Sequence, residues 1–425
     1  MLTMNRPDTK RMPKRANPLE AQKQLLDAVR SNVMPNESVP LEKALGRVLA
    51  KDVCSDINIP AYDKTFIDGY AIDTQDTKGA STAKPAVFNI VGKLFPTDYP
   101  TTIEIAQGEA VYVACGAPIP KGATATVKVE ETRLKNDKIE VIRELAPGEG
   151  VIPLGDDVKK GSLLMQKGQV LRPQDLGLLA SIGLTKAEVV REPRVAILSG
   201  GDELIKQCEG SKKIANNYAL VVAGLASELG ASPKILGIMP DELEKVMAKI
   251  GEALADSDIV VTIGGSSVGV KDFVPDALNS LGKPGVVAHG ILLRPGAVSG
   301  FGIVKGRPVV MLPGHIGSCI AGFYTFVAPL ISKYSGLAGE GLLPRLNAEL
   351  AADLETGPKF NFKLTRIKRV DGGLVVLQVK GGSSALTTIT KSNGYSIVPP
   401  HTKLKKGDRI DVYLFGKLEL SQINP

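Results

Sequence analysis

Three glycine-rich loops are the parts of this 425-residue chain whose residue types could hold a phosphate group. Glycines let the backbone approach an anion closely, and N–H groups at a helix N-terminus stabilise its charge. Tight strand-to-helix turns require the same glycines, so a single loop leaves both interpretations open. Three such loops together favour a binding site. The loops read Ser199-Gly200-Gly201-Asp202-Glu203, Gly264-Gly265-Ser266-Ser267-Val268-Gly269 and Pro313-Gly314-His315-Ile316-Gly317-Ser318.

Carboxylates stand beside these loops at Asp202, Glu203 and Asp272. Asp and Glu side chains can hold Mg²⁺ against phosphate oxygens, but solvated loop charges would give the same sequence. The three histidines are dispersed and fit no metal-ligand spacing, and only His315 lies in a candidate phosphate loop. Four cysteines lie far apart without a CxxC pair, so neither a zinc site nor a disulfide framework is indicated.

The elements that must position the loops alternate between strand and helix from Pro193 onward. Continuous apolar strands alternating with amphipathic helices predict a parallel sheet covered on both faces. Ligands bind such sheets outside the carboxyl ends of the strands, so all three loops should lie on one rim. We predict strands at 194–198, 234–238 and 258–263, and helices at 217–229 and 241–254.

The rest of the chain has a different pattern. Asn17 is a typical N-cap for a helix beginning at Pro18, and a second helix is predicted over 40–50. Short apolar runs separated by turn residues predict β-rich modules on either side of the α/β segment. The predicted domains are a basic disordered tail (1–17), a helical linker domain (18–58 with 148–192, including a helix at 173–182), a β-rich domain (59–147), an α/β domain (193–337) and a small C-terminal β-barrel-like domain (338–425).

Charge and hydropathy exclude some classes of function. The net charge is +7, but the first 17 residues carry five basic side chains against Asp8 alone. The chain has no Trp, and only 4% of its residues are aromatic. Proteins that bind single-stranded nucleic acid stack the bases on aromatic side chains, so this composition argues against nucleic acid as a partner. No continuous apolar run reaches about 18 residues and no signal peptide is visible, so we expect a cytoplasmic protein without a membrane anchor.

The run Pro60 to Ala71, Pro-Ala-Tyr-Asp-Lys-Thr-Phe-Ile-Asp-Gly-Tyr-Ala, resembles the entry motif of the molybdopterin molybdenumtransferase family. This family comprises the MoeA proteins and the E domain of gephyrin. The resemblance runs from about residue 18 to the C-terminus, and its further motifs follow in the family's order. They lie at 115–123, 155–161, 199–204, 264–272 and 312–314.

The resemblance implies an elongated multi-domain subunit that dimerises, with its site between the α/β domain of one subunit and the β-rich domain of the other. Family members bind adenylylated molybdopterin, accept molybdate, insert the metal and release AMP with a divalent cation. Carried over by position, the catalytic residues are Asp68, Asp157, Glu203 and Asp272. The Mg²⁺ ligands are Asp202, Glu203 and Asp272. The residues expected to bind the pterin substrate are Ser199, Gly200, Gly201, Asp202, Gly264, Gly265, Ser266, Ser267, Gly269, Arg294, Pro313, Gly314, His315 and Ser318.

Several motif positions depart from the family. Cys115 replaces a Thr, Val270 replaces an Asp, Ala297 replaces a Lys, and His315-Ile316 replaces Asn-Pro. The resemblance therefore predicts insertion of molybdate or tungstate, with a catalytically degenerate pterin-binding or regulatory paralogue as the alternative. The retained carboxylates favour the enzyme, whereas the charges lost at Val270 and Ala297 favour the binding protein.

Overall fold

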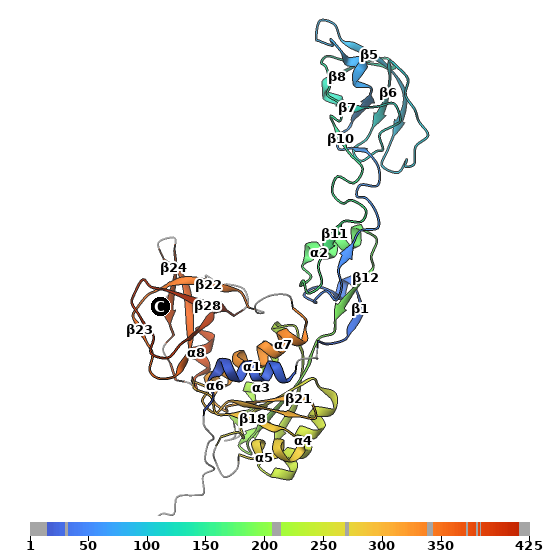
Figure 1. Ribbon diagram of the computed structural model, residues 1–425. Coiled ribbons are helices and arrows are strands. Elements are labelled where there is room, and N and C mark those ends of the chain that lie inside the picture. The colour runs from blue at the N-terminus through green and yellow to red at the C-terminus, as the bar shows by residue number, and fades with distance from the viewer. Residues whose placement is uncertain are drawn as a thin grey trace, which may run out of the picture.

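The computed structural model describes residues 15–29, 33–205, 214–267, 272–337, 343–370, 373–379, 381–382 and 384–415. The chain is elongated, as predicted (Figure 1). An α/β domain and a C-terminal β domain lie side by side at one end, and a narrow connecting segment leads to a separate β-rich module at the other. Most of the predicted basic tail, residues 1–14, lies outside the described residues, while Ala16 pairs with Ile291 of the α/β domain.

A six-stranded sheet in the order β16-β13-β17-β21-β20-β18 forms the α/β domain. The prediction of parallel strands is confirmed for β13 (Arg194–Gly200), β16 (Ser232–Met239), β17 (Ile259–Ile263) and β21 (Arg307–Leu312). One strand runs the other way, since β20 (Gly300–Val304) is antiparallel to both of its neighbours, β21 and β18 (Gly285–His289), and β18 therefore runs in the direction of the parallel strands. The sheet is therefore mostly, not wholly, parallel.

Alternate residues of the central strands enter two different cores. Val195 and Ile197 of β13 pack on the side of α3 (Asn217–Glu228), whereas Ala196 and Leu198 pack on the side of α4 (Leu243–Asp256) and α5 (Val274–Leu281). All five residues of β17 are buried, as expected for a strand covered on both faces. The predicted helices 217–229 and 241–254 thus agree with α3 and α4 within a few residues.

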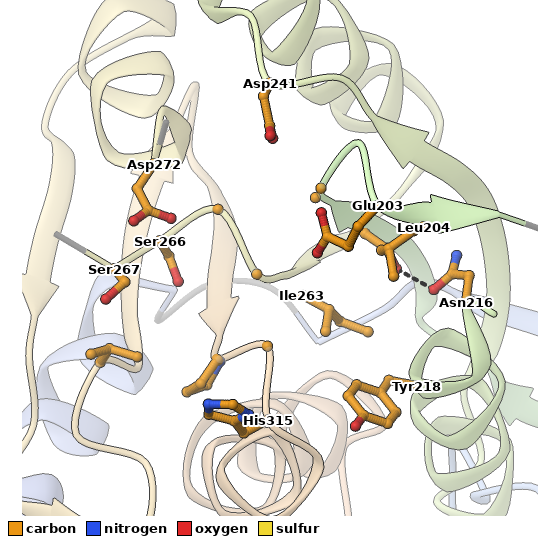
Figure 2. A pocket seen from close by; sticks show the side chains of 18 of the residues that line it. Glu203, Leu204, Asn216, Tyr218, Asp241, Ile263, Ser266, Ser267, Asp272 and His315 are labelled. Atoms are coloured by element: carbon orange, nitrogen blue, oxygen red, sulfur yellow. Dashed lines mark hydrogen bonds between the residues drawn. The ribbon is translucent and has the colours of Figure 1, made fainter. Parts of the chain in front are cut away.

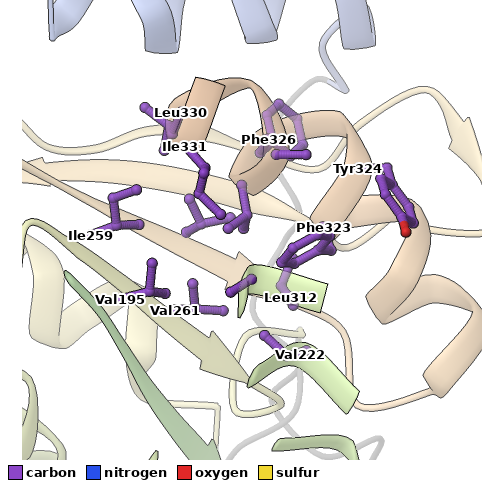
Figure 3. Packing of buried hydrophobic residues seen from close by; sticks show 14 of the residues in the cluster. Val195, Val222, Ile259, Val261, Leu312, Phe323, Tyr324, Phe326, Leu330 and Ile331 are labelled. Atoms are coloured by element: carbon purple, nitrogen blue, oxygen red, sulfur yellow. The ribbon is translucent and has the colours of Figure 1, made fainter. Parts of the chain in front are cut away.

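One long helical segment, Ile316–Tyr334, fills the core on the α3 side. It comprises α6 (Ile316–Gly322), the π-helical turn η4 (Phe323–Val327) and α7 (Ala328–Tyr334). By length and composition this segment could cross a membrane, although its apolar residues do not form one continuous run. Most of it is buried, with Phe323 lying near Leu312 of the sheet (Figure 3) and the Phe326 ring 5.7 Å from that of Phe301 in β20. The segment is the core helix of this domain.

The N-terminal helix was predicted correctly, and the helix after it was not. In α1 (Pro18–Ala28) the Asn17 carboxamide accepts a hydrogen bond from the Leu19 N–H at 2.9 Å, and α1 packs on η4 and α7. The predicted helix over 40–50 is wrong, because only a short 3-10 turn forms, η1 (Leu41–Lys43). Gly46 adopts a left-handed φ of +76°, which ends any helix there.

The connecting segment consists of two chain passages joined by short antiparallel ladders. The pairs are β1 (Asn36–Pro40) with β12 (Lys186–Val190), β2 (Val53–Cys54) with β11 (Leu163–Met165), and β3 (Lys64–Thr65) with β10 (Val151–Ile152). Helix α2 (Pro173–Ser181) packs beside them, one residue shorter than predicted.

The module beyond this connection, called the distal module below, is a sheet in the order β7-β4-β6-β5-β9-β8. Its elements are β4 (Gly69–Ile72), η2 (Thr74–Thr77), β5 (Ala86–Leu94), β6 (Glu109–Val113), β7 (Ala125–Lys128), η3 (Val129–Glu131), β8 (Thr132–Lys135) and β9 (Lys138–Val141).

The C-terminal domain is a five-stranded barrel, which confirms the barrel-like expectation. Strands β24, β25, β22, β28 and β26 form a ring that the β24–β26 pairing closes. One short strand of the α/β domain, β19 (Leu293–Arg294), adds to it, with Arg294 opposite Asn361. The elements are β22 (Arg345–Leu350), β23 (Leu354–Glu355), β24 (Phe360–Val370), β25 (Gly373–Gln378), α8 (Leu386–Thr390), β26 (Gly394–Val398), β27 (Lys403–Leu404) and β28 (Arg409–Leu414).

A two-arginine cluster fixes the start of the central sheet. The Asp258 carboxylate accepts hydrogen bonds from both terminal guanidinium nitrogens of Arg191, each at 3.0 Å, and from the backbone N–H of Arg194 at 2.7 Å. Burial alone would raise the pKa of Asp258, but these hydrogen bonds outweigh it and hold the pKa below its usual value. The ionised carboxylate therefore stabilises the folded state.

Asp258→Asn is expected to lower the free energy of unfolding at neutral pH by about 1–3 kcal/mol, because charge-assisted hydrogen bonds are lost. The folded-state pKa lies below the unfolded value of about 3.9, so this contribution is complete above that pH. It is lost as the pH falls through the folded pKa. Urea unfolding should separate variant and wild type at neutral pH and bring them together in strong acid. An equal difference at both extremes would contradict this assignment.

Candidate functional site

The three glycine-rich loops meet around one cavity of about 680 Å³ at the carboxyl ends of β13, β17 and β21 (Figure 2). This is the edge of the sheet at which the strand pattern predicted all three loops. Twelve of the residues predicted to act on the substrate or the metal line this cavity: Ser199, Gly200, Gly201, Glu203, Gly264, Gly265, Ser266, Ser267, Asp272, Pro313, Gly314 and His315. Asp202 is not among its lining residues, and Gly269 lies outside the described residues.

The first loop is shaped by Gly201, which has a φ of +129°. A Cβ atom there would lie 2.4 Å from the carboxylate oxygens of Glu203, so glycine allows the Glu203 side chain to fold back over the loop. Ser199 is buried and its hydroxyl lies 2.7 Å from the Asn216 Oδ1, which ties the loop to the start of α3. The first turn of that helix also contributes Tyr218 to the cavity (Figure 2).

Two carbonyl groups of the second loop point away from the cavity and accept hydrogen bonds from neighbouring elements. Gly265 O accepts from the Val274 N–H at 3.1 Å, and Ser266 O lies 2.5 Å from the His289 Nε2. The N–H groups of Gly265, Ser266 and Ser267 donate to no other described residue. Ser266 is 1% exposed, and its hydroxyl also has no partner. Unsatisfied donors beside a cavity are the pattern of an anion site.

Carboxylates reach the cavity from three segments. Glu203, Asp241 and Asp272 extend toward the space between the loops (Figure 2). Asp202 stands outside the cavity, where its carboxylate accepts a hydrogen bond from the Asp241 N–H at 3.3 Å. Within the described part of the chain, no three His, Cys, Asp or Glu residues are grouped closely enough to hold a metal ion. The donor set suits a Mg²⁺ that keeps water and phosphate oxygens as most of its ligands.

An adjoining cavity of about 490 Å³ shares Val298, Pro313 and His315 with the first. It contains two further predicted residues, Arg294 and Ser318, and its remaining lining residues are Leu293, Pro295, Gly296, Ala297, Gly357, Pro358, Lys359 and Asn361. None of them is acidic, and the described residues provide no ion pair for Arg294 or Lys359. This cavity is therefore suited to an anion.

The barrel contributes directly to the site through Ser384. Its hydroxyl lies 3.0 Å from the His315 Nδ1, which joins the C-terminal domain to the third loop. Sequence analysis missed Ser384, Asp241, Asn216 and Tyr218. Only the Asn216-Asn217 pair gave a signal, because polar residues just before a predicted helix are candidate caps.

Two predicted catalytic residues lie in the other half of the subunit. Asp68 precedes β4 in the distal module, where its Oδ1 accepts from the Cys115 N–H at 3.0 Å. Asp157 follows β10, where its own N–H donates to the Ile59 carbonyl at 3.0 Å. Figure 1 shows that this half projects away from the α/β domain. A single chain therefore does not bring Asp68 and Asp157 to Glu203 and Asp272.

Large apolar side chains are exposed on the distal module, which also carries Asp68. Phe66, Phe95 and Tyr99 are about half exposed, at 53%, 48% and 50%. Tyr99 stacks on Tyr62 with 4.0 Å between the ring centroids. Exposed apolar patches of this kind commonly mark an interaction surface.

Three family models match consecutive parts of the chain. They are described as the MoeA N-terminal region (domain I and II) over residues 17–183, a probable molybdopterin binding domain over 196–333, and the MoeA C-terminal region (domain IV) over 347–415.

Relatives and solved structures agree with these matches. The chain is 33% identical to a protein of Methanocaldococcus jannaschii that is named only for molybdopterin biosynthesis, covering 89% of this chain and 92% of that one. It is also 33% identical to the molybdopterin molybdenumtransferase of Bacillus subtilis, covering 89% of each. A crystal structure of the molybdopterin biosynthesis MoeA protein from Pyrococcus horikoshii OT3 superposes with a TM-score of 0.80 at 30% identity, covering 95% of this chain and 100% of that one.

Proposed function

Because this chain belongs to the MoeA family, we propose that it inserts molybdenum or tungsten, supplied as the oxyanion, into adenylylated molybdopterin with release of AMP. The observation that carries the proposal is the second glycine-rich loop. Its unpaired amides and the unpaired Ser266 hydroxyl supply hydrogen-bond donors for a phosphate group at the rim of the sheet.

The two adjoining cavities provide for two anions. The phosphates of the substrate would occupy the cavity lined by the three loops, and the metal oxyanion the cavity around Arg294 and Lys359. Ala297, where the family carries a Lys, lines that second cavity, and Lys359 from the barrel places a cation in the same space. This placement offsets the charge lost at Ala297 and favours the enzyme over a purely binding protein.

Mg²⁺ would be held by Glu203 and Asp272, with Asp202 behind them. When bound, it would neutralise charge between the carboxylates and the phosphate oxygens. Glu203 and Asp272 line different sides of the cavity (Figure 2) and would orient the substrate through this cation, while the loop amides would donate to its phosphate.

The complete site is proposed to need two subunits. Asp68 and Asp157 are far from the cavity within one chain (Figure 1), and the exposed apolar side chains of the distal module would be covered if that module approached the cavity of the partner subunit. A homodimer of this kind, working in the cytoplasm, would complete the acidic set from both chains.

AMP release tests the proposal. Purified protein with adenylylated molybdopterin and Mg²⁺ should release AMP when molybdate or tungstate is added, and much less without an oxyanion. Chromatographic detection of AMP over time measures the rate, and comparing the two oxyanions identifies the preferred metal. Binding of the nucleotide substrate without AMP release under either condition would instead establish a catalytically inactive binding paralogue.

A further inference from the structure

The strand β18 ends at His289, whose ring contacts the second glycine-rich loop from outside the cavity. The His289 Nε2 lies 2.5 Å from the Ser266 carbonyl oxygen. His289 is half-buried and is absent from the lining of both cavities, so this hydrogen bond directs the carbonyl away from the anion site. Sequence analysis gave this histidine no role, since 23 residues separate it from Ser266.

The direction of this carbonyl matters because the loop is intrinsically pliable. Gly264 and Gly265 have φ values of +79° and +68°, and glycine can exchange such conformations for others at little cost. A peptide rotation after Ser266 would turn a carbonyl oxygen toward the cavity in place of a donor. A carbonyl dipole pointing at a phosphate repels it, whereas an N–H group attracts it.

Two contacts restrain the carbonyls of this loop. The Val274 N–H holds Gly265 O from the start of α5, and the His289 ring holds Ser266 O from β18. The Ser266 hydroxyl, buried and unpaired, remains on the cavity side. The His289 bond is therefore the only side-chain contact to the loop carbonyls among the described residues.

We propose that His289 is a positioning residue for phosphate binding: its Nε2–H donates to the Ser266 carbonyl and so keeps the loop donors facing the cavity. The inference rests on the proposed function only in taking this cavity as the phosphate site. A carbonyl oxygen can only accept, so Nε2 must carry the proton. Neutral imidazole in this tautomer and imidazolium both satisfy the contact.

A matched pair of variants separates the hydrogen bond from packing. His289→Gln keeps an N–H donor at a similar reach, whereas His289→Phe keeps the ring volume and removes the donor. Affinity for AMP, measured by calorimetry, should fall about tenfold or more in His289→Phe and stay within about twofold of wild type in His289→Gln. Affinity for adenosine, which lacks the phosphate, should be the same in all three proteins. Val287→Thr, an exposed change on the same strand, serves as the control.

The outcomes distinguish the inference from the function on which it rests. If wild type does not bind AMP, the phosphate site itself is wrong and the inference fails with it. If wild type binds AMP and His289→Phe binds it equally well, or if His289→Gln loses as much affinity as His289→Phe, His289 does not position the loop. Should His289→Phe fail to fold, imidazole ¹⁵N shifts of wild type decide, since the chain has three histidines. An unprotonated Nε2 at His289 would overturn the proposal.

Discussion

Gly265→Val is expected to weaken binding of AMP and of adenylylated molybdopterin by about a hundredfold or more, the loss expected when several hydrogen bonds to one phosphate are removed. Gly265 has a φ of +68°, which a β-branched residue adopts only with strain. Its added Cβ would also lie 3.2 Å from the Val274 side chain, so we expect the backbone strain and this close contact together to shift the loop. Moving it displaces the amides that face the cavity.

Calorimetric titration with AMP measures this effect, and Gly251→Val provides the control. Gly251 lies in α4 of the same domain, and a Cβ there meets no atom within 4 Å. Both variants should retain the cooperative melting of wild type. Wild-type affinity in a folded Gly265→Val protein would show that the second loop does not hold the phosphate.

Asp68→Asn and Glu203→Gln are expected to leave binding of the nucleotide substrate within about twofold while slowing AMP release by about a hundredfold or more, the usual cost of removing an electrostatic group at a reacting centre. Both changes preserve shape. The Asn side chain can still accept the Cys115 N–H bond, and Gln can still fold over Gly201. Only the charge that would stabilise the metal step is removed.

Parallel measurement of affinity and of the AMP-release rate separates these two effects. Asp73→Asn is the matched control, because Asp73 caps η2 in the same distal module through an equivalent hydrogen bond to a backbone N–H. If affinity fell as much as the rate, Asp68 and Glu203 would instead act in binding the substrate and not in the reaction step.

The sequence was informative wherever a local pattern determines the structure. The continuous apolar strands from Arg194 predicted which loops share a rim, because parallel strands end at the same edge of a sheet. The Asn17-Pro18 cap predicted the start of α1. The helix expected over 40–50 failed although its apolar residues follow a helical spacing, because Gly46 adopts a left-handed φ and Val48 and Leu49 form bridges to Val170 and Val189 instead.

The missed site residues have non-local partners. Ser384 approaches His315 across 69 residues of sequence and a domain boundary, and His289 reaches Ser266 because β18 belongs to the same sheet as β17. The reversed direction of β20 was not predicted either, since a short buried strand has no pattern that gives its direction. Contacts of this kind become visible only when the chain is folded.

Mixing two inactive variants tests most directly the claim that one site is built from two subunits. If the proposed arrangement is correct, a dimer of one Asp68→Asn subunit and one Glu203→Gln subunit has one site with both changes and one site with neither. Random assembly gives half mixed dimers, so coexpression should restore about a quarter of wild-type AMP release. Mixing Glu203→Gln with Asp272→Asn, which lie in the same cavity, should restore none. Recovery with the first pair alone would match the account, whereas a mixture of Asp68→Asn and Glu203→Gln dimers as inactive as its components would contradict it.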